Sequence, residues 1–497
     1  MIKLNLKFIS FLLILFFSAC NTENKKPNVI IIYADDLGFG DVSAYNQGTL
    51  NTPNIDKIAN EGIKFTNGHS SSATCSPSRY ALLTGSYPWR NSKAKISTGA
   101  SMIINVDQKT LPKMFKANNY STAIVGKWHL GLGNGQINYN SKISPGPNDI
   151  GFDYSYIMPD TQDRVPTVYI EDGYVKNLDS NDPLYVSFNK NFDNQPTGKT
   201  NPEMLTMKWH HGHFNSIING ISRIGFMKGG EKARWSDVDM ADHFLNKVKS
   251  YITQNKDKPF FLFYSMQQPH VPRTPHPRFK GKSGMGPRGD VIIEADWCIG
   301  ELFKTLDNEK LLENTLIIIS SDNGPVLNDG YYDDAVEKIG NHTPSGIYRG
   351  GKYSLFEAGT RVPFISFWKG VTKPKTSDKL ISQIDLFNSL SSIIESKIKT
   401  SDSYDLSELL LKGDGKEREE LILEASGKTA LKYHNWVLIP PYKGKAVSTY
   451  TNVELGRSSS FQLYNLKTDP SQKINLVDQE KEKLAELLKI YNKVVND

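Results

Sequence analysis

Val29-Ile30-Ile31-Ile32-Tyr33-Ala34, which runs directly into Asp35 and Asp36, is the stretch that decides the fold class. It is apolar without alternation, as expected of a strand buried on both faces of a parallel sheet. Three further runs share this pattern and lead to polar groups: residues 122–126 before Lys127 and His129, 260–266 before His270, and 316–321 before Asp322 and Asn323. Helical patterns lie between the runs, at 55–61, 111–118, 240–252 and 295–306. The sequence therefore predicts an α/β fold with a large mixed, mostly parallel sheet sandwiched by helices.

The polar groups that follow these runs are expected to form one site. In open sheets of this kind, functional groups collect at the carboxyl ends of the strands. Four predicted strands lead to ionisable or metal-binding side chains. One shared site is therefore the simplest interpretation.

Composition sets the broad class. The chain has 497 residues, of which 38% are hydrophobic and 23% charged, which excludes collagen-like, disordered and polytopic membrane proteins. The net charge of +6 comes without a Lys/Arg-rich block, so no nucleic-acid partner is expected. No period of about 20 to 50 residues recurs, which disfavours solenoids and propellers.

The chain is predicted to divide into two domains. The main, catalytic domain is expected over residues 28–400. Past residue 400 the sequence becomes more polar, with short strand candidates at 420–424 and 436–439 and a closing helix at 478–495. We therefore expect a smaller C-terminal α+β domain over residues 401–497.

The N-terminus has the pattern of a secretory signal. Lys3 and Lys7 precede a short apolar run, which ends in Ser18-Ala19-Cys20. This ending resembles a bacterial lipobox, although Phe17 stands where leucine is usual, and the alternative is an ordinary signal peptide cut near a cysteine. We predict a signal peptide over 1–19, a palmitate-bearing Cys20, a tether over 20–27, and a lipid-anchored protein of a bacterial cell envelope, in the outer membrane or facing the periplasm.

The segment Cys75-Ser76-Pro77-Ser78-Arg79-Tyr80-Ala81-Leu82-Leu83-Thr84-Gly85 is predicted to be a short helix, with Pro77 near its start and Gly85 at its end. Cys75 would lie at the helix N-terminus, where negative charge is favoured, and Arg79 one turn further on. The alternative is a buried structural cysteine, but the neighbouring polar residues argue against it. The sequence leaves a disulfide with Cys298 open, although Cys298 is most simply a buried small hydrophobe.

This segment resembles the signature of the type I sulfatases, which belong to the alkaline phosphatase superfamily. The other motifs of that family match in order across most of the chain: Asp35-Asp36-Leu37-Gly38, Gly126-Lys127-Trp128-His129-Leu130-Gly131, Gln268-Pro269-His270-Val271-Pro272, Ser321-Asp322-Asn323-Gly324, Arg349-Gly350-Gly351-Lys352, and Leu463-Tyr464-Asn465-Leu466 with the following Asp469-Pro470 and Asn475-Leu476. The resemblance implies an alkaline phosphatase-like fold and a sulfuric ester hydrolase.

The resemblance also implies the chemistry of the site. Cys75 would be converted to formylglycine (3-oxoalanine) by a formylglycine-generating or sulfatase-maturating enzyme, and its hydrate would attack sulfur to give a covalent sulfate hemiacetal. One Ca²⁺ per chain would be held by Asp35, Asp36, Asp322, Asn323 and residue 75, and these oxygen donors suit a hard cation. Arg79, Lys127, Lys352 and His270 would supply positive charge, with His129 as base and His270, in preference to Lys352, as acid.

The expected substrate is a sulfated oligosaccharide. Within the family, the chain resembles bacterial exo-acting polysaccharide sulfatases of the N-acetylgalactosamine-6-sulfatase and galactose-6-sulfatase type. An insert over residues 144–232 carries aromatic and charged side chains suited to sugar: Asp163, Arg164, Tyr169, Trp209, His210 and His213. We expect Arg164 and His213 to contact the sugar, with His276, His342 and Arg349 as the second choice. Algal polysaccharides (ulvan, porphyran, carrageenan) and glycosaminoglycans all remain open.

Two other functions stay open at this point. Phosphonate and phosphodiester hydrolases of the same superfamily share the Cys-x-Pro-Ser-Arg segment, and a non-catalytic lipoprotein that binds sulfated glycans is the second alternative.

Two local patterns in the sequence are not expected to form functional sites of their own. His210-His211-Gly212-His213 lacks the further ligands of a closed zinc site and is expected to be a loop near the mouth of the site. Gly281-Lys282-Ser283 lacks the first glycine of a phosphate-binding loop.

Overall fold

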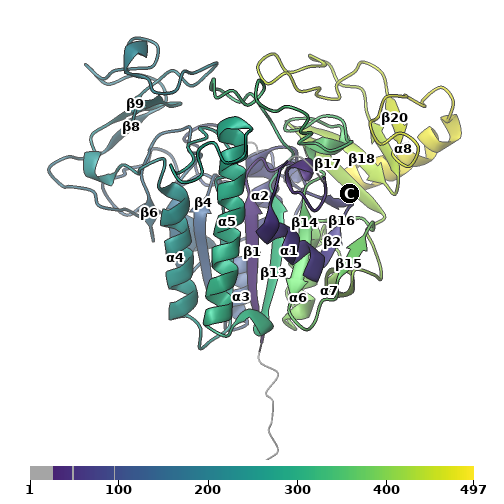
Figure 1. Cartoon of the computed structure of the whole chain (residues 1–497). Helices are drawn as coiled ribbons and strands as arrows, with labels where there is room; N and C mark the ends of the chain where they lie inside the picture. Colours follow the sequence, from purple (N-terminus) through teal and green to yellow (C-terminus); the bar gives the residue numbers. More distant parts are fainter. Residues whose placement is uncertain (1–25, 47–49, 95, 497) are drawn as a thin grey trace, which may run out of the picture.

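The computed structural model describes residues 26–46, 50–94 and 96–496 (Figure 1). The predicted signal peptide and Cys20 lie outside the described residues, as does most of the predicted tether.

A ten-stranded sheet forms the centre of the molecule, in the order β15-β2-β14-β13-β1-β12-β4-β5-β6-β7. Its strands are β1 (Asn28–Ala34), β2 (Ile63–Phe65), β4 (Ser121–Lys127), β5 (Tyr154–Met158), β6 (Ile170–Glu171), β7 (Tyr174–Val175), β12 (Phe260–Ser265), β13 (Thr315–Ser321), β14 (Phe364–Trp368) and β15 (Lys375–Ser377). The five central strands, β13 to β5, run parallel, whereas β14 is antiparallel to β13 and β6 to β5. The predicted mixed, mostly parallel sheet is confirmed.

Helices cover both faces of the sheet (Figure 1). One layer contains α1 (Pro53–Glu61), α4 (Met240–Gln254) and α5 (Gly286–Asn308), and the other contains α2 (Cys75–Thr84), α3 (Leu111–Ala117), α6 (Leu386–Ile393) and α7 (Ser407–Lys412). Successive residues of β1 point to opposite layers: Ile30 and Ile32 pack with the first, and Val29 and Ile31 with the second. This is why the strand is apolar at every position.

The C-terminal part is a four-stranded antiparallel sheet of β17 (Glu420–Ala425), β18 (Lys428–Tyr433), β19 (Trp436–Ile439) and β20 (Gln462–Asn465), against which α8 (Lys481–Asn496) packs. The two predicted strands and the closing helix are confirmed. The sheet packs directly on the main part, because Leu355 and Phe356 share its apolar cluster and Lys432 donates to the buried Glu357 (2.7 Å). The boundary at residue 400 stays a prediction.

The predicted insert over residues 144–232 is only partly a set of loops. Its first strands, β5 to β7, extend the main sheet, and Asp163 and Arg164 lie in the loop between β5 and β6. The remainder is mostly irregular and contains two small antiparallel pairs, β8 (Tyr185–Ser187) with β11 (Phe226–Lys228) and β9 (Ile217–Ile218) with β10 (Ile221–Ser222). A further short pair joins β3 (Gly68–His69) and β16 (Ile381–Ser382).

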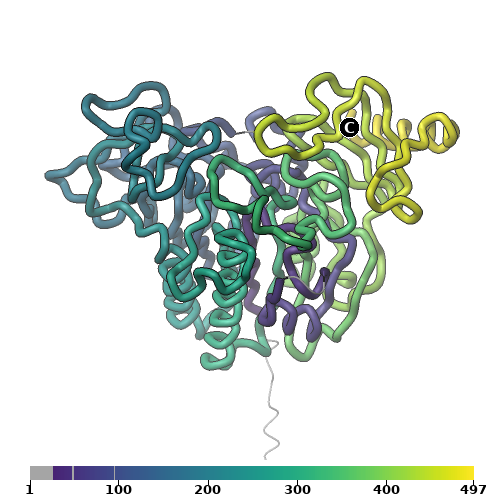
Figure 2. Tube along the Cα trace, turned by 45° about the horizontal axis from the view of Figure 1, so that its top comes forward, coloured from purple at the N-terminus to yellow at the C-terminus, as the bar shows by residue number. Residues whose placement is uncertain are grey.

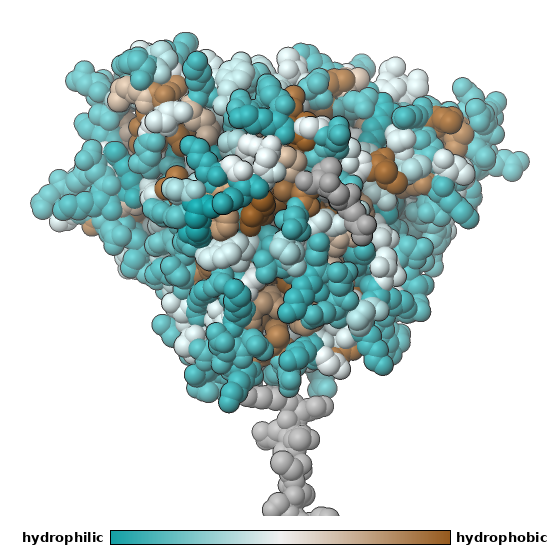
Figure 3. Space-filling view, viewed as in Figure 1, coloured by the Kyte–Doolittle hydropathy of each residue, from teal (hydrophilic) through white to brown (hydrophobic). Residues whose placement is uncertain are grey.

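The carboxyl ends of the parallel strands lie at the top of Figure 1, since β1 runs upward from the lower end of the described chain. In Figures 1 and 2 the insert, in blue and teal, rises on one side of this edge, and the C-terminal sheet, in yellow, rises on the other. Figure 3, drawn in the same view as Figure 1, shows that side of the molecule as mostly hydrophilic, with small apolar patches. Across the described residues, none of the helices has the length and apolar character that crossing a membrane requires.

Candidate active site

The ends of β1 and β13 bring four predicted metal ligands together. Asp35 and Asp36 follow β1, and Asp322 and Asn323 follow the neighbouring β13. The backbone N–H of Asp36 donates to Asp322 Oδ1 (3.1 Å), and the backbone N–H of Asp322 donates to the Ala34 carbonyl (3.1 Å). These bonds fix the two acidic turns against each other at the carboxyl edge of the sheet.

Cys75 is the first residue of α2, as predicted, and Gly85 ends that helix in the left-handed conformation (φ 62°). The Cys75 Sγ lies 3.5 Å from Asp35 Oδ1 and 4.0 Å from Asp36 Oδ1. Cys75 and Cys298 are both free and buried, so no disulfide joins them, and Cys298 lies in the apolar core as expected.

The surroundings of the Cys75 thiol disfavour its negative charge, contrary to the prediction from the helix N-terminus. Burial raises the pKa of Cys75, and the carboxylate of Asp322 raises it further. A neutral thiol is a poor nucleophile. A cation among the carboxylates would offset their charge at this position.

The acidic cluster fits a hard cation. Ligand atoms of Asp35, Asp36, Cys75 and Asp322 lie within 4.8 Å of one another, and all four side chains are buried. Asn323 donates through Nδ2 to Asp36 Oδ1 (2.8 Å), whereas its buried Oδ1 has no partner among the described residues. An unpaired carbonyl oxygen beside three carboxylates matches the donor set that Ca²⁺ prefers.

Three cations neutralise these carboxylates. Lys127 Nζ lies 2.6 Å from Asp35 Oδ2, and Arg79 bonds Asp322 Oδ2 through Nε (3.1 Å) and Nη2 (2.8 Å). Burial alone would raise the pKa of Asp322, but Arg79 and Lys127 outweigh it and hold that pKa below its ordinary value. The sequence assigned both cations to the substrate, and the structure shows that each also holds a carboxylate in place.

Lys352, the third cation, contacts Asp329, a residue that the sequence motifs did not predict. Its Nζ lies 2.9 Å from Asp36 Oδ2 and 2.8 Å from Asp329 Oδ2. Burial would raise the pKa of Asp36, but Lys352 and His270 hold it well below its usual range. Asp329 follows no strand and belongs to no matched motif, so no sequence signal marked it.

His270 has one nitrogen directed at the acidic cluster. Its Nδ1 lies 2.7 Å from the Val271 carbonyl, and because a carbonyl only accepts, Nδ1 carries the hydrogen. Nε2 lies 3.9 Å from Asp36 Oδ2. In the imidazolium form, Nε2 therefore presents its proton toward the cluster.

His129 is held by a carboxylate from the next strand. Its Nε2 lies 3.0 Å from Asp160 Oδ1, and its buried Nδ1 has no hydrogen-bond partner in the part of the chain that the structure describes. Burial lowers the pKa of His129 to about 3, against the raising effect of Asp160, so the ring is neutral at physiological pH. With Nε2–H donated to Asp160, Nδ1 carries the lone pair that a general base needs. Asp160 follows β5, and the end of that run, Tyr-Ile-Met-Pro-Asp, was the signal the sequence analysis overlooked.

The two predicted sugar-contacting residues both reach the site. Arg164 Nη1 donates to Asp160 Oδ1 (3.0 Å) and lies 3.1 Å from His129 Nε2; because Nη1 and Nε2–H are both donors, they converge on the Asp160 carboxylate and do not bond each other. His213 uses both nitrogens within the protein, bonding the His211 carbonyl and Asp163 Oδ2 at 2.6 Å each. The hydrogen bond to Asp163 raises the pKa of His213 against the lowering effect of burial. His213 is therefore a cation that holds Asp163, and it has no nitrogen left for a ligand.

Of His213 and Asp163, Asp163 is the one that can still accept a hydrogen bond from a ligand. Burial would raise its pKa, but the hydrogen bond from His213 and the charge of His270 hold it well below the ordinary range, so the carboxylate is ionised. Its buried Oδ1 accepts no hydrogen bond from any described residue.

A cavity of about 350 Å³ joins these groups. It is lined by Cys75, His129, Asp163, Arg164, His213, His270, Asp329 and Lys352, and also by Glu424 and Ser426 of the C-terminal sheet. Asp35, Asp36, Asp322 and Asn323 form the adjoining buried cluster. The His210–His213 segment is a loop, as expected, and His211 and His213 lie in the cavity wall.

The second-choice residues lie elsewhere: His342 bonds Asp41 (2.9 Å), Arg349 bonds Glu454 (2.6 Å), and His276 lies 3.9 Å from Asp239.

Comparison with known proteins agrees with the motifs. The family model described as Sulfatase matches residues 27–396. The chain is 47% identical over 478 residues to an N-acetylgalactosamine-6-O-sulfatase of Bacteroides thetaiotaomicron, covering 95% of this chain and 94% of that protein. A solved Bacteroides thetaiotaomicron structure, described as "6S-sulf" in work on glycosaminoglycan metabolism, superposes with a TM-score of 0.93 at 46% identity, covering 95% of this chain and all of that one. A phosphonate monoester hydrolase of Agrobacterium radiobacter shares the fold at a TM-score of 0.58 and 15% identity, covering 95% of each chain.

Proposed function

Since this chain belongs to the sulfatase family and is a sulfuric ester hydrolase, we propose that it removes sulfate from a sulfated sugar with formylglycine at position 75 and one Ca²⁺. The observation that carries this proposal is the position of Cys75, at the start of α2 and against the buried Asp35, Asp36 and Asp322. The Sγ of Cys75 lies 3.5 Å from Asp35 Oδ1, so an oxygen on an oxidised residue 75 would lie beside the same carboxylates.

Different residues support the two groups in this proposal, Ca²⁺ and formylglycine. Asp35, Asp36, Asp322 and Asn323 would hold Ca²⁺, which supplies positive charge at the sulfate oxygens. The aldehyde of formylglycine supplies, as its hydrate, the hydroxyl that attacks sulfur. Conversion of Cys75 needs a formylglycine-generating or sulfatase-maturating enzyme as partner.

The protein's own side chains would move the protons. His129 accepts a proton at Nδ1 while Asp160 holds Nε2–H. His270 donates from Nε2 to the departing sugar oxygen, because Lys352 already holds both Asp36 and Asp329. Lys127 and Arg79 hold the carboxylates in place and add positive charge beside the sulfate.

We propose that the substrate is a sulfated sugar of the N-acetylgalactosamine 6-sulfate type. The support is the 47% identical Bacteroides protein named for that activity, together with the lining of the cavity. We assign Asp163 Oδ1 as an acceptor for a sugar hydroxyl and Arg164 as a donor, with His213 acting through Asp163. The parent polymer can be a glycosaminoglycan or an algal polysaccharide such as ulvan.

The test compares two substrates in each variant. Arg164→Ala and Asp163→Asn are expected to lower kcat/KM for N-acetylgalactosamine 6-sulfate by roughly 10- to 100-fold, since each loses a hydrogen bond in a desolvated cavity. Hydrolysis of 4-nitrophenyl sulfate should fall far less, because this ester fills only the sulfate position. Arg234→Ala, a half-buried arginine just after the insert and outside the cavity lining, is the control. Equal losses on both substrates would remove the sugar assignment.

A phosphonate or phosphodiester hydrolase is the second candidate, since the Agrobacterium enzyme shares the fold. Its 15% identity shows fold alone, whereas the sulfatase relative matches at 47% along nearly the whole chain. Parallel assays on aryl sulfate, phenylphosphonate and phosphodiester substrates separate the two. A higher kcat/KM on a phosphorus ester would favour the second candidate.

For localisation, we propose a lipoprotein of a bacterial cell envelope, anchored through Cys20. The support is sequence alone: Lys3, Lys7, the apolar run and Ser18-Ala19-Cys20. Growth in labelled palmitate should label the wild-type protein and leave Cys20→Ser unlabelled. Label retained by Cys20→Ser would exclude this anchor.

A further inference from the structure

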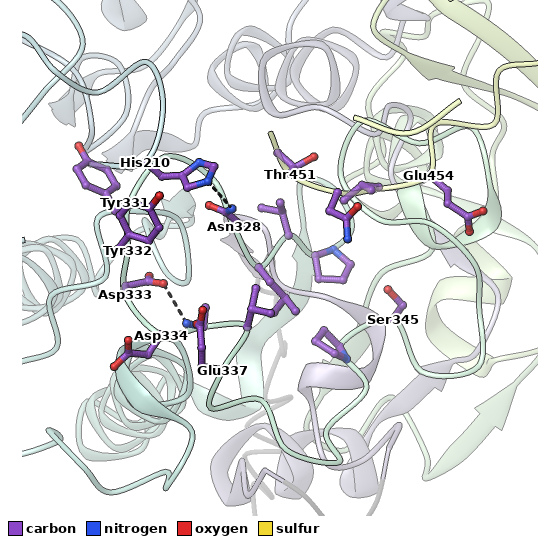
Figure 4. Close-up of a pocket in the computed structure, with 18 of the residues that line it drawn as sticks. His210, Asn328, Tyr331, Tyr332, Asp333, Asp334, Glu337, Ser345, Thr451 and Glu454 are labelled. Carbon is purple, nitrogen blue, oxygen red and sulfur yellow. Dashed lines mark hydrogen bonds between the residues drawn. The ribbon is translucent and has the colours of Figure 1, made fainter. Parts of the chain in front are cut away.

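Figure 4 shows the lining of a second cavity, of about 590 Å³. The two cavities lie on neighbouring residues, because His210 and Asn328 line the second cavity while their chain neighbours His211 and Asp329 line the first. The C-terminal segment 451–454 forms the opposite side in Figure 4. The His211 ring stacks at 4.6 Å on Tyr450, directly before that segment. A chain-like ligand held in the catalytic cavity would therefore emerge next to the second one.

The lining of this cavity offers unused hydrogen-bonding groups and aromatic surface. Thr451 is 8% exposed, and its buried Oγ1 pairs with nothing in the described chain. The Oδ1 of Asn328 is also buried and without a partner among the residues described, while its Nδ2 lies 3.5 Å from His210 Nε2. Tyr332 is 61% exposed on the same side of the cavity as Asn328. A tyrosine ring beside unpaired hydroxyl and amide groups suits a sugar, whose ring has apolar faces and hydroxyl edges.

The charges of the lining disfavour an anionic ligand, because its carboxylates outnumber its one histidine, His210. None of the described residues in this lining is a lysine or an arginine. Its carboxylates include Asp333, which pairs with Arg273 (2.9 Å), and Glu454, which pairs with Arg349 (2.6 Å), so those cations are already occupied. A uronic acid or a second sulfated residue would meet carboxylates without an available cation. An uncharged sugar meets no such penalty.

We infer that this cavity is a second sugar subsite, which binds an uncharged residue joined to the sulfated sugar. The inference rests on the proposed function and narrows its substrate to an oligosaccharide whose residue next to the sulfate-bearing sugar is neutral. Thr451 and Asn328 bind its hydroxyls, and Tyr332 packs on its ring.

The test compares N-acetylgalactosamine 6-sulfate alone with the same sulfated sugar joined to galactose or to glucuronic acid. We expect kcat/KM to be about tenfold higher for the galactose disaccharide than for the monosaccharide, as two added hydrogen bonds allow. The glucuronic acid disaccharide should gain less. Tyr332→Ala and Thr451→Val should each remove most of the galactose advantage. Tyr174→Ala, a 54% exposed tyrosine of β7, is the matched control and should keep the advantage.

Each outcome is decisive. Equal kcat/KM for monosaccharide and galactose disaccharide, or preference for glucuronic acid, overturns the subsite while leaving the sulfatase proposal intact. If no sugar sulfate is hydrolysed, the proposed function fails, and the cavity is tested by binding alone. In saturation-transfer NMR, the unsulfated disaccharide of N-acetylgalactosamine and galactose should give signals with wild type that Tyr332→Ala weakens. No signal with wild type overturns the subsite.

Discussion

Asp160→Asn isolates the contact that orients the proposed base. Asp160 accepts the Nε2 hydrogen of His129 at 3.0 Å, which leaves Nδ1 as the basic nitrogen. Asparagine keeps the shape but loses the charge, and its amide N–H₂ can turn toward Nε2. That would move the ring hydrogen to Nδ1 and remove the base.

The expected size follows from the bond that is lost. A hydrogen bond to a charged group contributes about 1.5–3 kcal/mol, so kcat should fall by roughly 10- to 150-fold. The fall in kcat should be the same at every pH between about 5 and 8. Burial already lowers the pKa of His129 to about 3, and Asp160 opposes that shift, so its removal lowers the pKa further. His129 is therefore neutral across this range in both proteins.

Sulfate release from 4-nitrophenyl sulfate, measured at pH 5.5, 6.5 and 7.5, gives kcat and KM for wild type and Asp160→Asn. Asp179→Asn provides the matched control, because Asp179 pairs with the exposed Lys232 in the same insert (2.6 Å). A structural effect would lower the thermal unfolding temperature and raise KM instead. A kcat within about twofold of wild type would refute the assignment of Asp160 and of His129 as base.

The remaining predictions concern the metal, residue 75 and stability. Removing Ca²⁺ with a chelator should abolish activity and added Ca²⁺ should restore it, while zinc without calcium in active protein would contradict the assignment. Asp322→Ala should cost far more activity than stability, read by sulfate release and by thermal unfolding, because it removes a ligand of the metal while Arg79 keeps its contacts with Asp35 (3.9 Å) and the Lys127 carbonyl (3.3 Å). Cys75→Ala should lose turnover while keeping the fold by circular dichroism, and full activity would end the formylglycine proposal. Burial raises the pKa of Glu294 to about 7, so the folded state resists its ionisation and loses roughly 3 kcal/mol of stability as pH rises from about 4.5 to 7. Urea unfolding of Glu294→Gln should show a smaller loss between pH 5 and 8, and an unchanged loss would rule out this source.

The sequence predicted the elements whose pattern is local. Each apolar run became a strand of the main sheet, because a strand covered on both faces shows its burial at every position. The predicted metal ligands came together because neighbouring parallel strands end at one edge. Gly85 ended α2 in a conformation that glycine adopts without strain.

The parts that could not be predicted depend on contacts between distant segments. Asp329 reaches Lys352 from an irregular segment, and Glu424 reaches the cavity from the C-terminal sheet. The engagement of both His213 nitrogens depends on the fold of the loop around His211, which has no periodic signal. The raised thiol pKa of Cys75 follows from its burial and from the Asp322 carboxylate across the site, neither of which its own helix reveals.

The central claim is that this site hydrolyses a sulfate ester of a sugar. Its most direct test is ion chromatography of sulfate released from N-acetylgalactosamine 6-sulfate by calcium-loaded protein produced together with a maturating enzyme. We expect wild type to release one sulfate per sugar and Cys75→Ala to release none. Absence of sulfate release from this sugar, alongside hydrolysis of a phosphodiester by the same preparation, would contradict the claim.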